Sequence, residues 1–306
     1  MMSKFLMLFR LLALFLFSGP VLAQVEFEKP DQFPSEDIHY IPYQHVGFSQ
    51  YGSPSLKGSR KIVLTYDDGP DINLTPKLLD LLETYNVKAT FFVVGEKITA
   101  KTLPILERMV NEGHIVASHD WKHINSNSLI LQQFSSNLKK SILTLENLFD
   151  SMGVHVTEMY YRFPYGAYGQ RQSYHQFNVL KDVSQELYDE NCINFVFWDI
   201  DTADWVAEMR PADTVQTIHA HIDGGTAYRH AVVRNAQGTV TGYKKEAYTV
   251  KSPPGGGVIL MHDIHARTIA ASELLFKSLE THKIQVVPLS TVKEFSYEGK
   301  NCILRP

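Results

Sequence analysis

Two adjacent carboxylates follow directly after a short β-branched run. Asp67 and Asp68 follow the run Lys61–Tyr66, and a Gly-Pro dipeptide follows them. Neighbouring side chains of an extended strand point to opposite faces, but a Gly-Pro turn releases the backbone so that both acids can reach one pocket. Two close carboxylates repel each other unless a cation or an unequal sharing of protons relieves the repulsion. We therefore interpret one aspartate as an acid–base group and the other as a metal ligand.

Two histidines with metal-ligand spacing lie further along the chain. His119 and His123 are four residues apart, which is one turn of a helix, so both imidazoles could face the same ion. Two imidazoles and one carboxylate leave positions open for water and substrate, as a catalytic metal requires. We predict a divalent metal site with zinc as the first choice, although such sites also accept cobalt and nickel.

Three later segments place further reactive groups at turns after apolar runs. Arg162 precedes the turn 163–166, where the arginine could orient an acid and the backbone N–H groups could stabilise an oxyanion. The segment Phe197–Trp205 supplies three acids and two tryptophans, whose rings could stack on a sugar. His262 ends the run Val258–Met261 and is placed to act as an acid.

Short β-branched runs alternate with amphipathic helices after the first sixth of the chain, which predicts an α/β fold built on a parallel sheet. Seven runs are expected to be strands buried on both faces, at 62–66, 89–94, 115–118, 159–163, 193–198, 258–261 and 284–288. Helical periodicity lies between them at 74–85, 103–112, 129–152, 177–190 and 270–281. Seven strands separated by helices favour a barrel over an open sheet.

One stretch interrupts this alternation. Residues from about 207 to 257 contain a short helix candidate, Asp213–Ile222, followed by two alternating runs around Asn235–Gly238 that predict a hairpin. We interpret the stretch as an insertion before the last strands of the barrel, where loops commonly determine specificity.

The N-terminus predicts export. Residues 1–23 contain Lys4 and Arg10, an apolar run Leu11–Phe17 and small residues before Ala23, as in a secretory signal peptide. The run is far shorter than the roughly 20 residues of a membrane span. We expect an exported protein, periplasmic or secreted, with no stable membrane insertion; an uncleaved N-terminal anchor is the alternative. Residues 24–58 are expected to form an N-terminal arm, and 59–306 the main domain.

The net charge limits the classes of binding partner, and the cysteine content bears on the cellular compartment. Without the signal segment the chain has 27 basic and 33 acidic residues. The resulting net charge of −6 argues against a nucleic-acid partner. Cys192 and Cys302 are the two cysteines of the chain. An oxidising compartment would allow them to pair, but the sequence leaves that bridge open because it does not give their distance.

Taken together, five ordered motifs resemble those of the polysaccharide deacetylase family, also called carbohydrate esterase family 4, with its NodB homology domain. The similarity spans about residues 59–289. The motifs are Thr65-Tyr66-Asp67-Asp68-Gly69-Pro70, His119 with His123, Arg162-Phe163-Pro164-Tyr165-Gly166, Asp201-Thr202-Ala203-Asp204-Trp205 and Leu260-Met261-His262. The resemblance implies a distorted (β/α) barrel and a metal-dependent N- or O-deacetylase.

Roles carried over from the family divide the first motifs between proton transfer and metal binding. Asp67 would be the general base, and Arg162 would tether it. The metal ligands would be Asp68, His119 and His123.

The remaining motifs would complete the reaction site. The backbone N–H of Tyr165 would help to hold the oxyanion. His262 would be the general acid, tuned by Asp204 in preference to Asp201. The acetate pocket and groove would be lined by Leu260 and Trp205.

Two positions depart from the family, and the substrate stays open. Asp120 stands where Ser or Thr usually follows the first metal histidine, so an extra negative charge beside the ion could alter metal preference; Tyr66 replaces a usual Phe. The resemblance implies a polysaccharide substrate and a monomer. We expect N-acetylated peptidoglycan sugars first, with chitooligosaccharides or acetylxylan as alternatives.

Two rival functions are kept. His119-Asp120-x-x-His123 differs from the zincin motif His-Glu-x-x-His by a shorter acid, so a zincin-like metalloprotease is one alternative. That motif belongs inside a helix, whereas here it follows a strand-like run. A non-catalytic glycan-binding relative is the other, and the intact acids and histidines argue against it.

Overall fold

A computed structural model describes residues 52–168, 175–297 and 301–304. The expected signal peptide, residues 1–23, and most of the expected N-terminal arm lie outside the described residues. The described end of the arm forms a single 3-10 turn, Pro54–Leu56, whose Leu56 is buried. Within the described part of the chain, no helix is long and apolar enough to cross a membrane.

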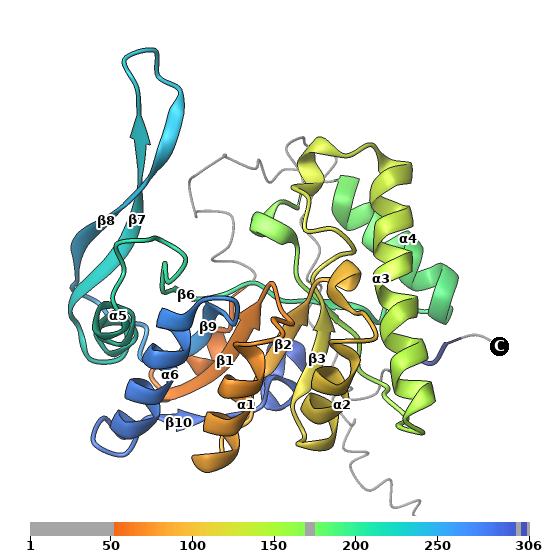
Figure 1. Cartoon of the computed structure of the whole chain (residues 1–306), viewed down its shortest axis with the longest axis horizontal. Helices are drawn as coiled ribbons and strands as arrows, with labels where there is room; N and C mark the ends of the chain where they lie inside the picture. Colours follow the sequence, from red (N-terminus) through yellow and green to blue (C-terminus); the bar gives the residue numbers. More distant parts are fainter. Residues whose placement is uncertain (1–51, 169–174, 298–300, 305–306) are drawn as a thin grey trace, which may run out of the picture.

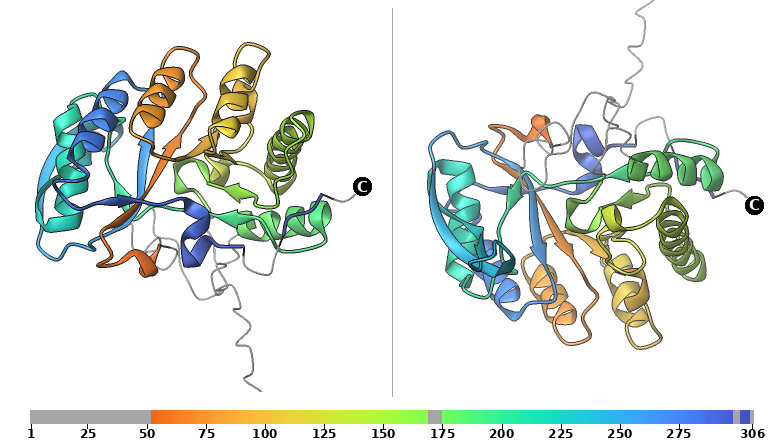
Figure 2. Two further views of the ribbon diagram at one scale, coloured as in Figure 1. Left: turned by 90° about the horizontal axis from the view of Figure 1, so that it is seen from below. Right: turned by 90° about the horizontal axis from the view of Figure 1, so that it is seen from above.

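One parallel sheet forms the centre of the molecule and curls into a half-barrel (Figures 1 and 2). Its strand order is β5-β4-β3-β2-β1-β9-β6, and β10 pairs with the start of β1. The strands are β1 (Lys61–Asp67), β2 (Thr90–Val93), β3 (Ile115–Ser118), β4 (Tyr160–Tyr161), β5 (Asn194–Phe195), β6 (Ile200–Asp201), β9 (Gly257–His262) and β10 (Gln285–Val286). The distorted barrel expected from the sequence is confirmed.

All seven expected strands are present, and the structure adds β6. This strand pairs Ile200 and Asp201 with Ile259 and Leu260 of β9. β6 begins just beyond the run expected at 193–198, whose strand β5 ends at Phe195, so the pattern does not show two separate strands there. β6 closes the sheet on the side of β9 and directs the following loop toward the carboxyl ends of the strands.

Six helices cover the outer face of the sheet or flank it (Figure 2). They are α1 (Thr75–Thr84), α2 (Leu103–Asn111), α3 (Leu131–Ser151), α4 (His175–Tyr188), α5 (Pro211–Asp223) and α6 (Ala266–Ser278). The apolar face expected on α3 is confirmed, because Phe134, Leu138, Ile142 and Leu145 are all buried. Burying such a stripe against a sheet is what stabilises an amphipathic helix in a protein.

The expected insertion separates from the barrel. After α5, β7 (Gly225–Arg234) and β8 (Val240–Val250) form an antiparallel two-stranded sheet of their own. Figure 1 shows this hairpin rising from the side of the barrel that carries β6 and β9. The hairpin predicted from the sequence is therefore confirmed, and β7 begins before its alternating run, which started at Tyr228.

A disulfide joins the C-terminal tail to the barrel. Cys192, just before β5, is bonded to Cys302, with their Cα atoms 5.4 Å apart. Beside it, the buried hydroxyl oxygen of Tyr297 lies 2.6 Å from the carbonyl oxygens of both Met159 and Cys192, either of which can accept its hydrogen. The pairing that the sequence left open is thus present in the fold.

Candidate metal centre and active site

The end of β1 turns both aspartates toward the same side. Asp67 is 2% exposed, and Asp68 has a left-handed backbone with φ of 73°. That conformation breaks the alternation of the strand, so Asp67 Oδ2 and Asp68 Oδ1 lie 3.6 Å and 3.4 Å from the same atom, His119 Nε2. The expectation that the turn gathers the two acids holds.

The histidine pair lies in a tight loop after β3 and not on a helix. Asp120 and His123 both have positive φ, 63° and 51°. The loop is held by backbone bonds from Gly95 N to Asp120 O and from Glu96 N to Trp121 O, both 2.9 Å. The helical turn assumed from the spacing is wrong, because a parallel strand that ends at the active-site edge continues here into a loop. The two imidazoles still converge on one point.

Three of these groups form a donor set that fits a divalent cation. One ligand atom from each of Asp68, His119 and His123 lies within 4.8 Å of the others. His123 Nε2 is 3.0 Å from Asp68 Oδ1, a buried oxygen that has no hydrogen-bond partner among the described residues. His119 Nδ1 donates to the carbonyl of Arg162 at 2.9 Å, which leaves its Nε2 lone pair directed at the site. Two imidazoles and a carboxylate suit zinc and similar metals.

The electrostatics of the centre favour a bound positive charge. Burial alone would raise the pKa of Asp68, but the neighbouring imidazoles of His119 and His123 hold it well below its usual range. Burial would lower the pKa of His119, and the charges of Asp67 and Asp68 outweigh it, so the net direction is upward. The raised pKa of His119 reflects the negative charge of the two aspartates, and the lowered pKa of Asp68 reflects the imidazoles beside it, so the carboxylates and a positive charge stabilise each other here.

Arg162 is fully buried and fixes the orientation of Asp67. Its Nη1 donates to Asp67 Oδ1 and to Thr65 Oγ1, both at 2.7 Å. Its Nε donates to Val196 O at 2.9 Å and its Nη2 to Phe197 O at 3.1 Å. A buried guanidinium needs such partners, because an unpaired buried charge is costly. The arginine therefore holds one carboxylate oxygen and leaves the other facing the metal centre.

The second acid–base group stands beside the first. β9 runs parallel to β1, and His262 is the register partner of Asp67. His262 Nδ1 donates to Asp204 Oδ1 at 2.7 Å, while the second oxygen of Asp204 accepts from Thr268 Oγ1 at 2.6 Å. Burial on its own would lower the pKa of His262, but the charge of Asp204 raises it to about 10. A protonated, oriented imidazole thus faces the centre.

Of the two acids considered for tuning this histidine, Asp204 makes the contact. Asp201 instead accepts from the backbone N–H of Ala203 at 2.8 Å, and its other oxygen lies 3.7 Å from His230 Nδ1. The short β6 places the loop after it directly against His262, a relation that only the sheet order creates.

The remaining predicted residues differ in exposure: Tyr165 is exposed, Trp205 is half-buried and Leu260 is buried. Tyr165 has φ of 59°, is 63% exposed, and its ring centroid is 4.7 Å from that of His123. Leu260 is buried on β9, two residues before His262. The half-buried Trp205 packs its ring against side chains of the hairpin.

Sequence analysis missed three polar side chains that support the site. Thr65 receives the Arg162 bond, and Thr268 on α6 donates to Asp204. Asp263 is fully buried against the turn after β1 and accepts a hydrogen bond from Thr75 Oγ1 at 2.5 Å; burial raises its pKa to about 7. The threonines gave no signal because threonine is common in strands and helices. Asp263 follows His262 directly and could have been noticed as a second acid at that strand end.

Asp120, the departure from the family pattern, is buried beside the metal ligands. Burial raises its pKa to about 6, and the backbone N–H groups of Trp121 and Lys122 oppose this rise.

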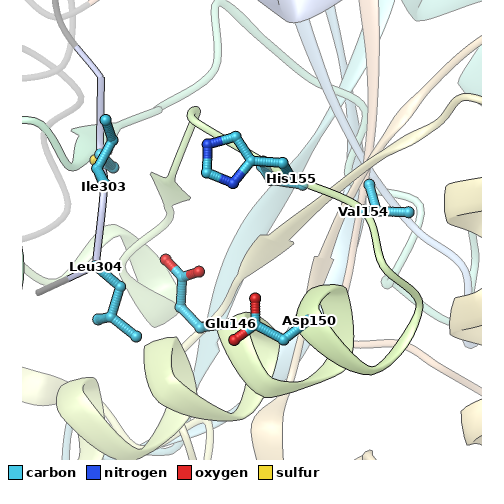
Figure 3. Close-up of a pocket in the computed structure, with 8 residues that line it drawn as sticks. Glu146, Asp150, Val154, His155, Ile303 and Leu304 are labelled. Carbon is cyan, nitrogen blue, oxygen red and sulfur yellow. The ribbon is translucent and has the colours of Figure 1, made fainter. Parts of the chain in front are cut away.

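A recess elsewhere on the molecule contains none of the predicted site residues. It has a volume of about 260 Å³ and lies between the end of α3 and the C-terminal tail (Figure 3). Glu146, Asp150 and His155 contribute its polar groups, and Glu146 Oε1 accepts from Tyr188 at 2.5 Å. In the described part of the chain, the metal-capable cluster is the one at β1.

Comparisons with known proteins agree with this geometry. A family model described as Polysaccharide deacetylase matches residues 56–179. The chain is 30% identical over 236 residues to the peptidoglycan-N-acetylglucosamine deacetylase PgdA of Listeria monocytogenes, covering 77% of this chain and 39% of that protein. It thus spans about two fifths of that relative. It is also 30% identical over 202 residues to the peptidoglycan-N-acetylmuramic acid deacetylase PdaA of Bacillus subtilis, covering 63% of this chain and 70% of that protein.

A solved structure shares the fold. A family 4 acetyl xylan esterase from Clostridium thermocellum, in complex with a cobalt ion, superposes with a TM-score of 0.54 at 22% identity over 76% of this chain and 89% of the esterase. The half-barrel, the ordered motifs and the sequence similarity lead to one assignment. The chain belongs to the polysaccharide deacetylase family.

Proposed function

We propose that the protein is a metal-dependent hydrolase that removes acetyl groups from an N-acetylated polysaccharide, with peptidoglycan amino sugars as the first substrate. The observation that carries the proposal is the gathering of Asp68, His119 and His123 beside Asp67 and the protonated His262. The similarity to peptidoglycan deacetylases supports the choice of substrate.

The cation, with zinc as the first choice, would be held by Asp68, His119 and His123. When bound, it would polarise the acetyl carbonyl and lower the pKa of a coordinated water. Asp67 is placed to accept the proton of the attacking water, because Arg162 fixes one of its oxygens and leaves the other facing the centre.

The opposite side of the site serves the leaving group. Protonated His262, oriented by Asp204, is placed to donate its proton to the amine nitrogen as the C–N bond breaks. The backbone N–H of Tyr165 would stabilise the oxyanion, and Leu260 and Trp205 would line the acetate pocket and groove.

The same chemistry serves chitooligosaccharides or acetylxylan, which stay as alternative substrates. A zincin-like protease is disfavoured, because its histidine pair requires a helix and the loop after β3 is not one. A non-catalytic glycan-binding protein would not need both the base and the acid that this site retains. We further propose that the protein acts outside the cytoplasm, in the periplasm or secreted, as a monomer.

Acetate release tests the function directly. Purified protein is incubated with peptidoglycan, chitooligosaccharides and acetylxylan, after chelator treatment and after adding back zinc, cobalt or nickel. We expect acetate release from at least one glycan, loss of release on chelation, and recovery with metal. Asp67→Asn should lower kcat by about 10²–10⁴-fold because the general base is gone.

The Asp120→Asn variant distinguishes a deacetylase from the zincin-like protease. In a deacetylase this variant keeps the base Asp67 and should retain most of its activity with metal in excess. Loss of activity at Asp120 alone, with Asp67→Asn fully active, would overturn the proposal.

A further inference from the structure

The hairpin of β7 and β8, here called the arm, is firmly attached at its base. Lys245 Nζ lies 2.8 Å from Asp213 Oδ2, a carboxylate on α5 that is 1% exposed, and Lys245 N donates to Glu208 Oε2 at 2.9 Å. Tyr228 N donates to Thr217 Oγ1 at 3.0 Å. The arm is thus positioned by the barrel, and Figure 1 shows it extending past the carboxyl ends of the strands, where the site lies.

One face of the arm turns toward the loop that carries Asp204. Residues opposite each other in an antiparallel pair share a face, and Val232 pairs with Tyr243 while His230 pairs with Lys245. The Trp205 ring lies 4.8 Å from that of Tyr243, edge to face, and 5.1 Å from that of His230. The residue after the acid that orients His262 is therefore in contact with the arm.

These contacts leave an aromatic surface open to solvent. Tyr243 is 44% exposed, although its edge is fixed against Trp205. Tyr165, whose ring contacts the ring of the metal ligand His123, is 63% exposed. Two exposed tyrosines thus flank the same centre from different elements.

A polymer substrate explains this arrangement. Single exposed apolar residues on a surface need no explanation, but oriented rings at the rim of a reaction site form a binding surface for flat, partly apolar groups. A pyranose ring has such faces, and a glycan bound at the metal must continue across the rim. We propose that the arm forms one wall of the substrate groove, and that Tyr243 with Trp205 binds a sugar next to the one that is deacetylated.

This inference rests on the proposed function and deepens it. It makes the protein an enzyme for oligomers, since the arm contributes binding only when the glycan is long enough to reach Tyr243. The residue acts on specificity, because its ring packs against Trp205 and His230 at the base of the proposed groove wall.

The test compares chain lengths. Acetate release is measured for the dimer and the pentamer of N-acetylglucosamine with wild type, Tyr243→Ala, Tyr243→Phe and Val240→Ala. Val240 is a matched control, an exposed apolar residue on the same arm. We expect Tyr243→Ala to lower kcat/KM for the pentamer about tenfold with little change for the dimer, while Tyr243→Phe and Val240→Ala stay near wild type.

Outcomes separate the inference from the function. Suppose that the wild type releases acetate, but Tyr243→Ala has no effect or the same effect on the dimer and the pentamer. The proposed role of the arm is then wrong, and the proposed deacetylase function is retained. If the wild type releases no acetate, the proposed function is wrong, and calorimetric titration with the pentamer tests the arm by itself. The proposed role of the arm then requires that Tyr243→Ala raise the Kd for the pentamer about tenfold.

Light scattering tests whether the exposed surface of the arm binds a second copy of the chain instead of a glycan. We expect wild type and Tyr243→Ala to have the same mass at assay concentration, and a dimer lost in the variant would overturn the proposal.

Discussion

Arg162 determines the charge balance of the site at the level of single residues. Its side chain is wholly buried, with donors to one carboxylate, one hydroxyl and two carbonyls, and it stacks 4.0 Å from the centre of the Phe92 ring. A buried ion pair contributes little compared with an apolar pair of the same shape, but breaking it leaves an uncompensated charge. The arginine is therefore both an orienting and a structural residue.

Replacing this arginine tests that view. Arg162→Ala should lower the free energy of unfolding by about 3–5 kcal/mol, because Asp67 is left buried and unpaired. Urea denaturation of the metal-free protein gives the value. The double variant Arg162→Met with Asp67→Leu removes both charges and should recover part of the loss. Additive losses in the double variant would contradict the argument.

The pair of His262 and Asp204 predicts a pH effect at the same scale. The pKa of His262 is raised from 6.5 to about 10 by Asp204, so the imidazole stays protonated through neutral pH and loses its proton as the pH rises toward 10. Asp204→Asn should lower that pKa by about 1–3 pH units. NMR titration of the chelator-treated protein, with His262→Gln for assignment, measures it.

Asp201→Asn is the control, because that acid does not contact His262. It should leave the titration unchanged. In the metal-loaded enzyme, Asp204→Asn should move the alkaline limb of kcat/KM to lower pH, and an unmoved limb would exclude His262 as the acid.

At the scale of elements, the carboxyl ends of neighbouring parallel strands gather the site. β1 ends in Asp67, with Asp68 in the turn after it, and β9 ends in His262. The loops after β3, β4 and β6 carry the histidine pair, Arg162 and Asp204. A parallel sheet places all these ends at one edge, as in other barrel enzymes. The turn after β1 is the least tolerant of them, since it packs directly on Asp263.

Gly69 shows this intolerance. A Cβ at this position would lie 2.2 Å from Asp263 Oδ2 and 2.5 Å from Oδ1, so Gly69→Ala must displace the turn that carries Asp68. We expect metal affinity to fall by about 10–100-fold, as measured by chelator competition. Gly242→Ala is the control, because a Cβ there meets nothing within 4 Å. Adding Asp263→Ala to Gly69→Ala should restore part of the affinity; no restoration would refute the clash.

At the scale of the whole molecule, the disulfide links the C-terminal tail to the β5 edge of the barrel across 110 residues of sequence. Bridges over long loops stabilise a fold mainly by restricting the unfolded chain. The metal ligands and acid–base groups lie at the ends of other strands or in the loops after them. The bridge therefore serves stability, and the chemistry does not need it.

Removing the bridge should separate these two properties. Cys192→Ser with Cys302→Ser should lower the free energy of unfolding by about 2–5 kcal/mol and leave acetate release unchanged below the unfolding transition. Thermal unfolding and the acetate assay measure the two effects. Wild type treated with a reductant should have the same melting temperature as the double variant. Equal melting temperatures for oxidised and reduced wild type would show that the disulfide does not stabilise the fold.

Local sequence signals determined much of this protein. The strand runs, the apolar stripe of α3, the hairpin turn and the pairs Asp67-Asp68 and His119 with His123 depend on neighbours in the chain, which the sequence displays directly. The ordered motifs indicated the family, and the barrel followed from the alternation of strands and helices. The one local error was the helix assumed under the histidine pair, where backbone conformation and not spacing brings the rings together.

Contacts between distant segments were decided only by the tertiary structure. The bond from His119 to the carbonyl of Arg162, the choice of Asp204 over Asp201, the pairing of the cysteines and the contact of Tyr243 with Trp205 all join residues far apart in sequence. Such contacts depend on strand order and loop path, which a short β6 can change without any periodic signal. The sequence therefore specified which groups could react, and the packing of the chain specified which of them meet.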